Sequence, residues 1–170
     1  NDMRFSDEKL EAARNFANKL WNASRFVLMN LEEGDSATLP DLSELAPEDR
    51  WILSRLSRTV KSVTANIEHF ELGIALSEIY DFTWDLFCDW YIEMAKSRIF
   101  ERGTKEAATA RRVLLYVLTA ILKLLHPYMP FITEEIYQAL PHDTPSIMIS
   151  SYPVYDESLV FPTEEEEVDR

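Results

Sequence analysis

The sequence is poor in the residues that build turn-rich and disulfide-bonded folds. Its 170 residues include only 3 glycines and 1 cysteine. So few glycines argue against a β-rich fold with many tight turns, and they lie too far apart to form a glycine-rich phosphate loop. The single Cys88 excludes an internal disulfide framework and is typical of a reducing cytoplasm, where we expect the protein.

The sequence also lacks a recognisable catalytic or metal-binding motif. Its three histidines lie far apart, and no paired CxxC, HExxH or GxSxG pattern occurs. Asp85, Asp89 and Glu93 recur every fourth residue, but no Glu-x-x-His partner completes a metal site of the kind found in helical bundles. No apolar run approaches the ~20 residues of a membrane span, and the polar start is not a signal peptide. We therefore expect no catalytic residue, no metal and no membrane contact in this chain, which lacks an initial Met and looks like a piece of a longer protein.

Acidic residues outnumber basic ones, but many of them are concentrated in two segments. The formal net charge is -13, from 30 acids against 17 bases. Residues 32–49 and 156–169 hold seven acids each and no Lys or Arg. A polyanion responds to the charges within a Debye length of roughly 8–10 Å rather than to the total. The remaining body is close to neutral and has basic patches, so nucleic-acid binding is not excluded.

Residues 14–31 carry three positive charges and no acid, proline or glycine. Apolar and small residues recur there at helical spacing and predict a buried face: Leu10, Ala13, Ala17, Leu20, Ala23, Ser24, Val27 and Leu31. A second, cationic and amide-rich stripe contains Asn15, Lys19, Asn22 and Phe26, flanked by Arg14, Asn18 and Arg25. Cations contact phosphates, amides bond base edges, and an aromatic ring can stack on a base. The pattern also fits a solvated helix face with one stray Phe.

Hydrophobic periodicity together with the proline and glycine positions predicts an all-α fold, an antiparallel bundle of about five helices. The helices are expected at residues 6–33, from residue 47 onward, and at 72–100, 104–126 and 130–140. Ser6 is the expected N-cap of the first helix, and Pro47 the first residue of the second. The helix at 72–100 is expected to be central. We divide the chain into a bundle of residues 1–153 and an acidic segment of residues 154–170.

Three local expectations complete this outline. The second helix should present a solvated basic outer face formed by Arg50, Arg55, Arg58 and Lys61. Residues 146–152 should be extended, and the acidic segment should be either disordered or the start of a further helix. Leu86 and Trp90 should lie on the core face of the third helix, with Ile92 and Glu93 pointing away from it.

Five segments resemble, in order, the anticodon-binding region of class I aminoacyl-tRNA synthetases, and the likeness is closest to the valyl enzymes. They are NFANKLWNASRFVLMNLE, DRWILSRLSRTV, FCDWYIEMAKSRIF, KLLHPYMPFITEEIYQ and SIMISSYP. The resemblance runs from Asp2 to about Pro153. The HIGH and KMSKS motifs, the editing domain and the C-terminal coiled-coil arm have no counterpart. The resemblance thus implies a domain without ligase activity of its own, from an enzyme whose missing catalytic domain would use ATP and Mg to attach valine.

The resemblance also implies a partner and a set of contacts. The partner would be valine tRNA, with no DNA and no membrane involved, and we expect a monomer. Lys19 and Arg25 would hold a phosphate or a base edge, Asn22 would bond a base, and Phe26 would stack on one. Further expected positions are Ile92 and Glu93 as a second wall at the anticodon, and Arg14, Asn15, Asn18 and Lys96 along the tRNA backbone. Trp21 and Trp90 are interpreted as scaffold.

Three alternatives stay open at this point. Glu93 could accept a hydrogen bond from a base amino group, or it could pair with Lys96 or Lys19. The domain could belong to an isoleucyl- or leucyl-tRNA synthetase, which share the first-helix and HPxxPF-type signatures. It could also be a helical protein-interaction module, whose binding would depend less on salt than RNA binding does.

Overall fold

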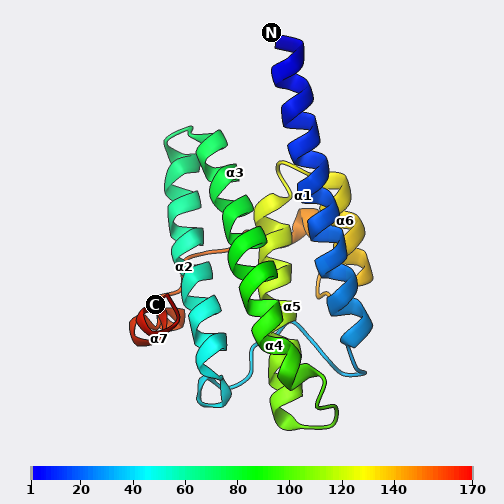
Figure 1. Cartoon of the computed structure of the whole chain (residues 1–170), viewed down its shortest axis with the longest axis vertical. Helices are drawn as coiled ribbons and strands as arrows, with labels where there is room; N and C mark the ends of the chain where they lie inside the picture. The colour runs from blue at the N-terminus through cyan, green and yellow to red at the C-terminus, as the bar shows by residue number, and fades with distance from the viewer. Residues whose placement is uncertain (1, 170) are drawn as a thin grey trace.

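All regular secondary structure in the described part of the chain, residues 2–169, is helical (Figure 1). In this computed structural model, side chains are described for residues 7–169. The elements are α1 (Asp2–Asn30), the 3-10 turn η1 (Leu42–Glu44), α2 (Pro47–Glu68), α3 (Leu72–Asp81), the π-helical stretch η2 (Phe82–Tyr91), α4 (Ile92–Ile99), α5 (Lys105–Leu125), α6 (Pro130–Ala139), the 3-10 turns η3 (Ile147–Ile149) and η4 (Glu157–Leu159), and α7 (Pro162–Asp169). The all-α prediction is confirmed.

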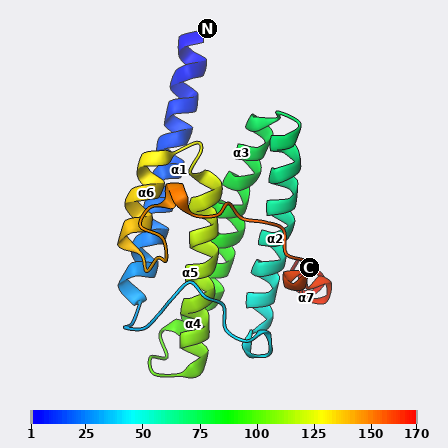
Figure 2. The ribbon, with the colours of Figure 1, turned by 180° about the vertical axis from the view of Figure 1, so that it is seen from behind.

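The central helix of the bundle is α5, which contacts α1, α2, α3, α4 and α6 (Figures 1 and 2). Its sequence is apolar on nearly all sides, and most of its residues are buried. Thr104 caps it, because its hydroxyl accepts a hydrogen bond from the Ala107 N–H at 3.1 Å. The expectation that residues 72–100 form the central helix is therefore wrong. That segment lies against α5 and also faces α1 and α2.

The first helix begins earlier than its sequence suggested and extends beyond the end of the bundle (Figure 1). It starts at Asp2, so Ser6 lies inside the helix and is not its N-cap. Leu20 and Val27 are buried as predicted, and so is Phe16, which was not expected in the core. Leu10 is 63% exposed because the projecting part of α1 has no neighbouring helix to cover it.

Residues 72–99 form one continuous helical rod in which η2 has π geometry. A π-helix closes its hydrogen bonds at i→i+5 and so takes more residues per turn than an α-helix. The buried positions consequently fall on Phe87, Tyr91 and Ala95, one residue out of phase with Leu86 and Trp90, which were predicted to face the core. Trp90 is 59% exposed and Ile92 is buried, which reverses the orientation expected for both.

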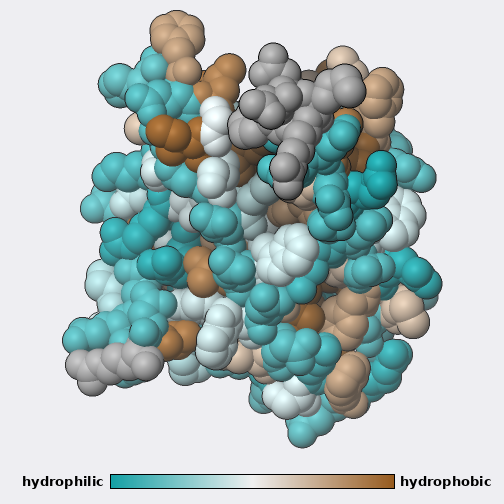
Figure 3. Space-filling view, turned by 45° about the horizontal axis from the view of Figure 1, so that its top comes forward, coloured by the Kyte–Doolittle hydropathy of each residue, from teal (hydrophilic) through white to brown (hydrophobic). Residues whose placement is uncertain are grey.

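The second helix opens at Pro47 as predicted. At its far end the chain turns sharply into α3 through Phe70, which has a φ of 59° and is 89% exposed. Leu72 and Ile74 are also exposed beside this turn. Figure 3 shows hydrophobic surface at this end of the α2–α3 pair.

The basic outer face of α2 is only partly solvated, because α7 lies across it (Figure 1). Arg50 and Arg55 are half-buried, while Arg58 and Lys61 stay exposed as predicted. Carboxylates of Glu164, Glu165 and Asp169 form ion pairs with arginines of α2. Of the two alternatives predicted for the acidic segment, residues 162–169 therefore adopt the helical one. In residues 146–152 a 3-10 turn, η3, stands where extended chain was expected.

Two arginines, the buried Arg111 and the largely buried Arg98, hold loops and helix ends together. The guanidinium of Arg98 on α4 donates two hydrogen bonds to the fully buried carboxylate of Asp49, near the start of α2. Arg111 of α5 donates from Nε to Asp35 Oδ2 at 2.7 Å and lies 3.2 Å from Glu32. These pairs fix the chain that leaves α1 and the end of α4 against the core. Among the described residues, no helix is both long and apolar enough to cross a membrane.

Candidate nucleic-acid interface

One side of α1 packs along the α3–η2–α4 rod through aromatic and charged side chains. Near the middle of α1, the Phe16 ring stacks on Tyr80 with a centroid separation of 3.9 Å. Farther along, Lys19 lies beside Asp89, and Phe26 lies beside Lys96. The spacing of Lys19 and Phe26 on one helix therefore places both residues on the seam between α1 and the rod.

Lys19 is held in place by η2. Its Nζ donates to Asp89 Oδ1 at 2.8 Å and lies 5.0 Å from the centroid of the Trp84 ring. The hydrogen bond to Asp89 raises the pKa of Lys19, and burial opposes this shift only in part. Lys19 is therefore fully protonated at neutral pH but already has a counter-charge. A phosphate would have to compete with Asp89 for it.

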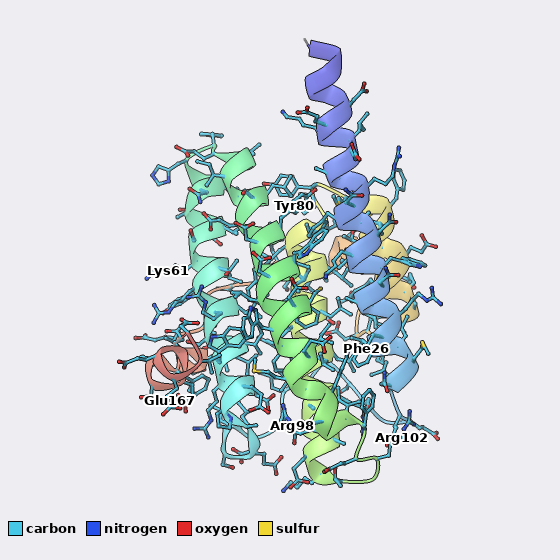
Figure 4. The ribbon with its side chains drawn as sticks, in the orientation of Figure 1. Phe26, Lys61, Tyr80, Arg98, Arg102 and Glu167 are labelled. Atoms are coloured by element: carbon cyan, nitrogen blue, oxygen red, sulfur yellow. The ribbon has the colours of Figure 1, made fainter. Side chains whose placement is uncertain are left out.

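Phe26 is half-buried near the end of α1, on the side that faces α4 (Figure 4). Its ring meets Phe100 edge to face, with centroids 6.5 Å apart. The Lys96 ammonium lies 5.5 Å from the centroid of the Phe26 ring, within the range of a cation–π contact. Phe100 itself is 62% exposed, so the pair offers an open aromatic surface next to a cation.

Glu93 takes the ion-pair alternative in this structure. Its Oε1 accepts a hydrogen bond from Lys96 Nζ at 2.7 Å, and the Glu93 side chain remains 60% exposed. The pair orients the Lys96 ammonium over Phe26. An exposed carboxylate oxygen at this place can also accept a hydrogen bond from a base amino group.

The outward face of α1 is open and carries cations and amides. Arg14, Asn15, Asn18, Asn22 and Arg25 are all exposed. Arg25 forms no ion pair with any carboxylate of residues 7–169, and neither does Arg14. Their guanidinium groups are thus available to an external anion.

The structure brings most of the predicted site residues together, with one clear exception. Lys19, Phe26, Glu93 and Lys96 lie along the seam, and the exposed residues of α1 continue this surface outward. Ile92 is only 6% exposed and belongs to the core, so it cannot form a wall for RNA. Trp21 and Trp90, interpreted as scaffold, are both exposed. Phe100 was missed, although it is an aromatic residue directly after the end of a cationic helix.

We call this surface the α1–α4 face and define it by Lys19, Asn22, Arg25, Phe26, Glu93, Lys96 and Phe100. It combines cations, an amide, a carboxylate and two aromatic rings without an enclosed cavity. This set of groups suits unpaired nucleotides, whose bases stack on rings and expose their hydrogen-bonding edges. It suits a regular duplex poorly, because paired bases offer no free ring face.

The sequence profile of the family described as "Anticodon-binding domain of tRNA ligase" matches residues 49–170. The chain belongs to this family. The match includes α2 to α7, so the helix that lies on the basic face of α2 falls within the family's domain.

Relatives of this anticodon-binding domain also cover α1. A valine–tRNA ligase of Clostridium acetobutylicum is 54% identical over 165 residues, which is 97% of this chain and 19% of that protein. A valine–tRNA ligase of Enterococcus faecalis is 51% identical over 158 residues, or 92% of this chain and 18% of that protein. The chain thus spans about a fifth of the length of the curated relatives it matches.

A solved structure shows the same fold. It is the ternary complex of LeuRS with tRNA and LeuAMS from Agrobacterium radiobacter, with a TM-score of 0.66 and 24% sequence identity. The similarity covers 88% of this chain and 17% of that one. The helical arrangement of this anticodon-binding domain is therefore shared with a much longer tRNA synthetase.

Proposed function

We propose that this domain binds the anticodon stem-loop of valine tRNA through the α1–α4 face, as part of a valine–tRNA ligase. The proposal rests on two observations taken together: the chain has this exposed face, and relatives of about 50% identity are valine–tRNA ligases. The attachment of valine with ATP and Mg would take place in parts of such an enzyme that lie outside these residues. The domain would act as a monomer in the cytoplasm.

In this proposal each group of the face has a distinct task. Arg25 binds a phosphate, because it is exposed and forms no ion pair within residues 7–169. Phe26 and Phe100 supply ring surface for a splayed base, and Asn22 offers a donor and an acceptor to its edge. Glu93 accepts from a base amino group, while Arg14, Asn15, Asn18 and Lys96 follow the backbone. Residues 1–153 supply all of these contacts.

The direct test is binding of a fluorescein-labelled valine anticodon stem-loop, compared with the stem-loops of isoleucine and leucine tRNAs. We expect preference for the valine loop, and chemical footprints confined to the anticodon loop when the whole tRNA is used. Tighter binding of the isoleucine or leucine loop would make an isoleucyl or leucyl enzyme the better assignment, and equal binding of all three loops would refute selective recognition of the valine anticodon by this domain. Binding that does not respond to salt would favour a protein-interaction module, since phosphate contacts release counterions.

Two substitutions test the face itself. Phe26→Leu should weaken binding by about 1–3 kcal/mol, the usual value of one base–aromatic stack. Arg25→Gln should reduce the slope of log K against log salt by about 0.7, the contribution of one phosphate contact on a single strand. Lys123→Gln on α5 is the matched control, because it removes the same charge away from the face. A loss as large for Lys123→Gln as for Arg25→Gln would refute the assignment.

A further inference from the structure

The outer face of α2 carries a second set of cations, on the side of the molecule away from α1 (Figure 1). Arg50, Arg55, Arg58 and Lys61 project from it, and side chains of the segment from Tyr155 to Asp169 contact all four. Arg50 and Arg55 are half-buried, while Arg58 and Lys61 remain exposed. Figure 4 shows Lys61 and Glu167 on this side of the structure. Nothing in the α1–α4 face requires these residues.

Carboxylates of α7 bind the guanidinium groups of the α2 arginines in the way that an anionic ligand would. Arg58 Nε donates to both oxygens of Glu165, at 2.6 and 2.9 Å. Arg50 Nη1 lies 3.4 Å from Glu164, and Arg55 Nη1 lies 3.6 Å from Asp169. The planar guanidinium that binds a carboxylate in this way binds a phosphate equally well.

The segment before α7 is attached to α2 by a buried side chain and a backbone hydrogen bond, whereas α7 itself contacts α2 mainly through charged groups. Before α7, Leu159 is buried, and the Phe161 N–H donates to Ser54 Oγ at 2.9 Å. Within α7, the Trp51 indole donates to Asp169 at 2.9 Å, Glu165 is buried and Val168 packs against the core, while most of the other side chains are exposed. The helix can therefore leave α2 while the chain before it stays attached.

From this geometry we propose that the outer face of α2 is a second surface that binds the RNA phosphate backbone. In the absence of RNA, α7 of the same chain lies on this surface, and RNA displaces it. The acids of α7 take the place of phosphates while no RNA is bound. Release frees the guanidinium groups of Arg50, Arg55 and Arg58, beside the already exposed Lys61. The neighbouring acids Glu78, Asp81 and Asp85 on α3 and η2 limit the surface to the outward side of α2.

Neutralising the three paired acids tests the proposal. The variant E164Q/E165Q/D169N should bind a labelled single-stranded RNA of mixed sequence, without an anticodon loop, at least about 10-fold more tightly at low salt. Its salt slope should be steeper by about 2, the value for three phosphate contacts at 0.7 each. The matched control is E135Q/E157Q/E167Q, which removes the same charge from exposed acids that form no ion pair among the described residues. Equal gains in both variants would overturn the proposal, because only net charge would then matter.

Two further measurements keep the test decisive if the first variant is unstable. Within the E164Q/E165Q/D169N background, Arg58→Gln should reduce the gain in salt slope by about 0.7, the share of one phosphate contact, and Lys123→Gln should leave it unchanged. In the unaltered protein, saturating RNA should speed hydrogen–deuterium exchange of residues 162–169. Unchanged or slower exchange there would refute release of α7. Binding of the valine anticodon loop to the α1–α4 face is measured separately, so either proposal can fail alone.

Discussion

Replacing Asp49 should destabilise the domain more than almost any other single change. Its carboxylate is fully buried and accepts hydrogen bonds from Tyr91 Oη at 2.6 Å and from Arg98 Nη1 and Nη2 at 3.0 and 2.5 Å. It also accepts from the Ala46 N–H at 2.9 Å at the start of α2. Asp49→Ala leaves these donors without a partner inside the protein.

The expected magnitude follows from these contacts. Removing one member of a buried ion pair usually costs about 3–5 kcal/mol. Glu48 Oε1 remains 3.1 Å from Arg98 Nε, but it offers charge only, because that nitrogen has no hydrogen bond of proper geometry. We therefore expect a loss of about 3 kcal/mol in the free energy of unfolding. In a domain of this size that corresponds to a melting temperature lower by roughly 6–12 °C.

Urea unfolding of Asp49→Ala, Arg98→Ala and the double variant measures the loss and its origin. The double variant should lose less than the sum of the two single variants, because removal of both partners leaves no buried lone charge. A loss below about 1 kcal/mol for Asp49→Ala, or strictly additive losses, would refute the reasoning. Lys105→Ala is the control, since its ion pair with Glu44 is exposed and should contribute little.

Three other outcomes follow from the structure. Burial, and after it the charge of Asp49, raise the pKa of Tyr91 well above 10. The stability that the neutral phenol contributes is therefore complete below pH ~10 and is lost as the pH rises further. In thermal melts at pH 8–11, the melting temperature of Tyr91→Phe should fall less steeply with pH than that of the unaltered protein. Phe26→Ala should cost about 1–3 kcal/mol of stability through its half-buried contact with Phe100, while Phe26→Leu costs less, and an unchanged melting temperature for Phe26→Ala would contradict this packing. Burial raises the pKa of the Cys88 thiol to about 12, so iodoacetamide at pH 8 should label the folded domain far more slowly than the urea-unfolded chain, and equal rates would contradict its burial.

Local signals predicted helix positions well where proline or a capping residue marks the boundary. Pro47, Thr104 and Pro130 each stand at a helix start within one residue of the expected place. Ser6 failed as a cap because α1 continues through it to Asp2. Leu10 failed as a core residue because helical periodicity does not reveal that a helix outruns its neighbours.

The candidate site was predictable on α1 but less so on α4. The stripe of Asn22, Arg25 and Phe26 needs only regular α geometry, which α1 keeps throughout. On the third helix the π stretch changes the phase, so Ile92 turned inward and Trp90 outward. No local residue pattern in the sequence indicated the π-helical stretch.

The long-range ion pairs could not be predicted from the sequence. Nothing in the spacing of Arg58 and Glu165, which are 107 positions apart, indicates that they meet. The two segments were correctly seen as basic and acidic, but the basic face was assigned to solvent and the acidic segment, whether disordered or helical, was given no partner. Charge complementarity between distant segments became informative only when the fold placed them together.

The uninterrupted course of α1 has a mechanical consequence. Its 29 residues contain neither glycine nor proline and span about 43 Å at 1.5 Å per residue. A lever of this kind has no joint at which bending could be absorbed. A force on the projecting blue end in Figure 1 would therefore be transmitted along the helix to Arg25 and Phe26 at its far end. In the same way, a nucleotide bound at Arg25 and Phe26 would be mechanically coupled to the projecting turns.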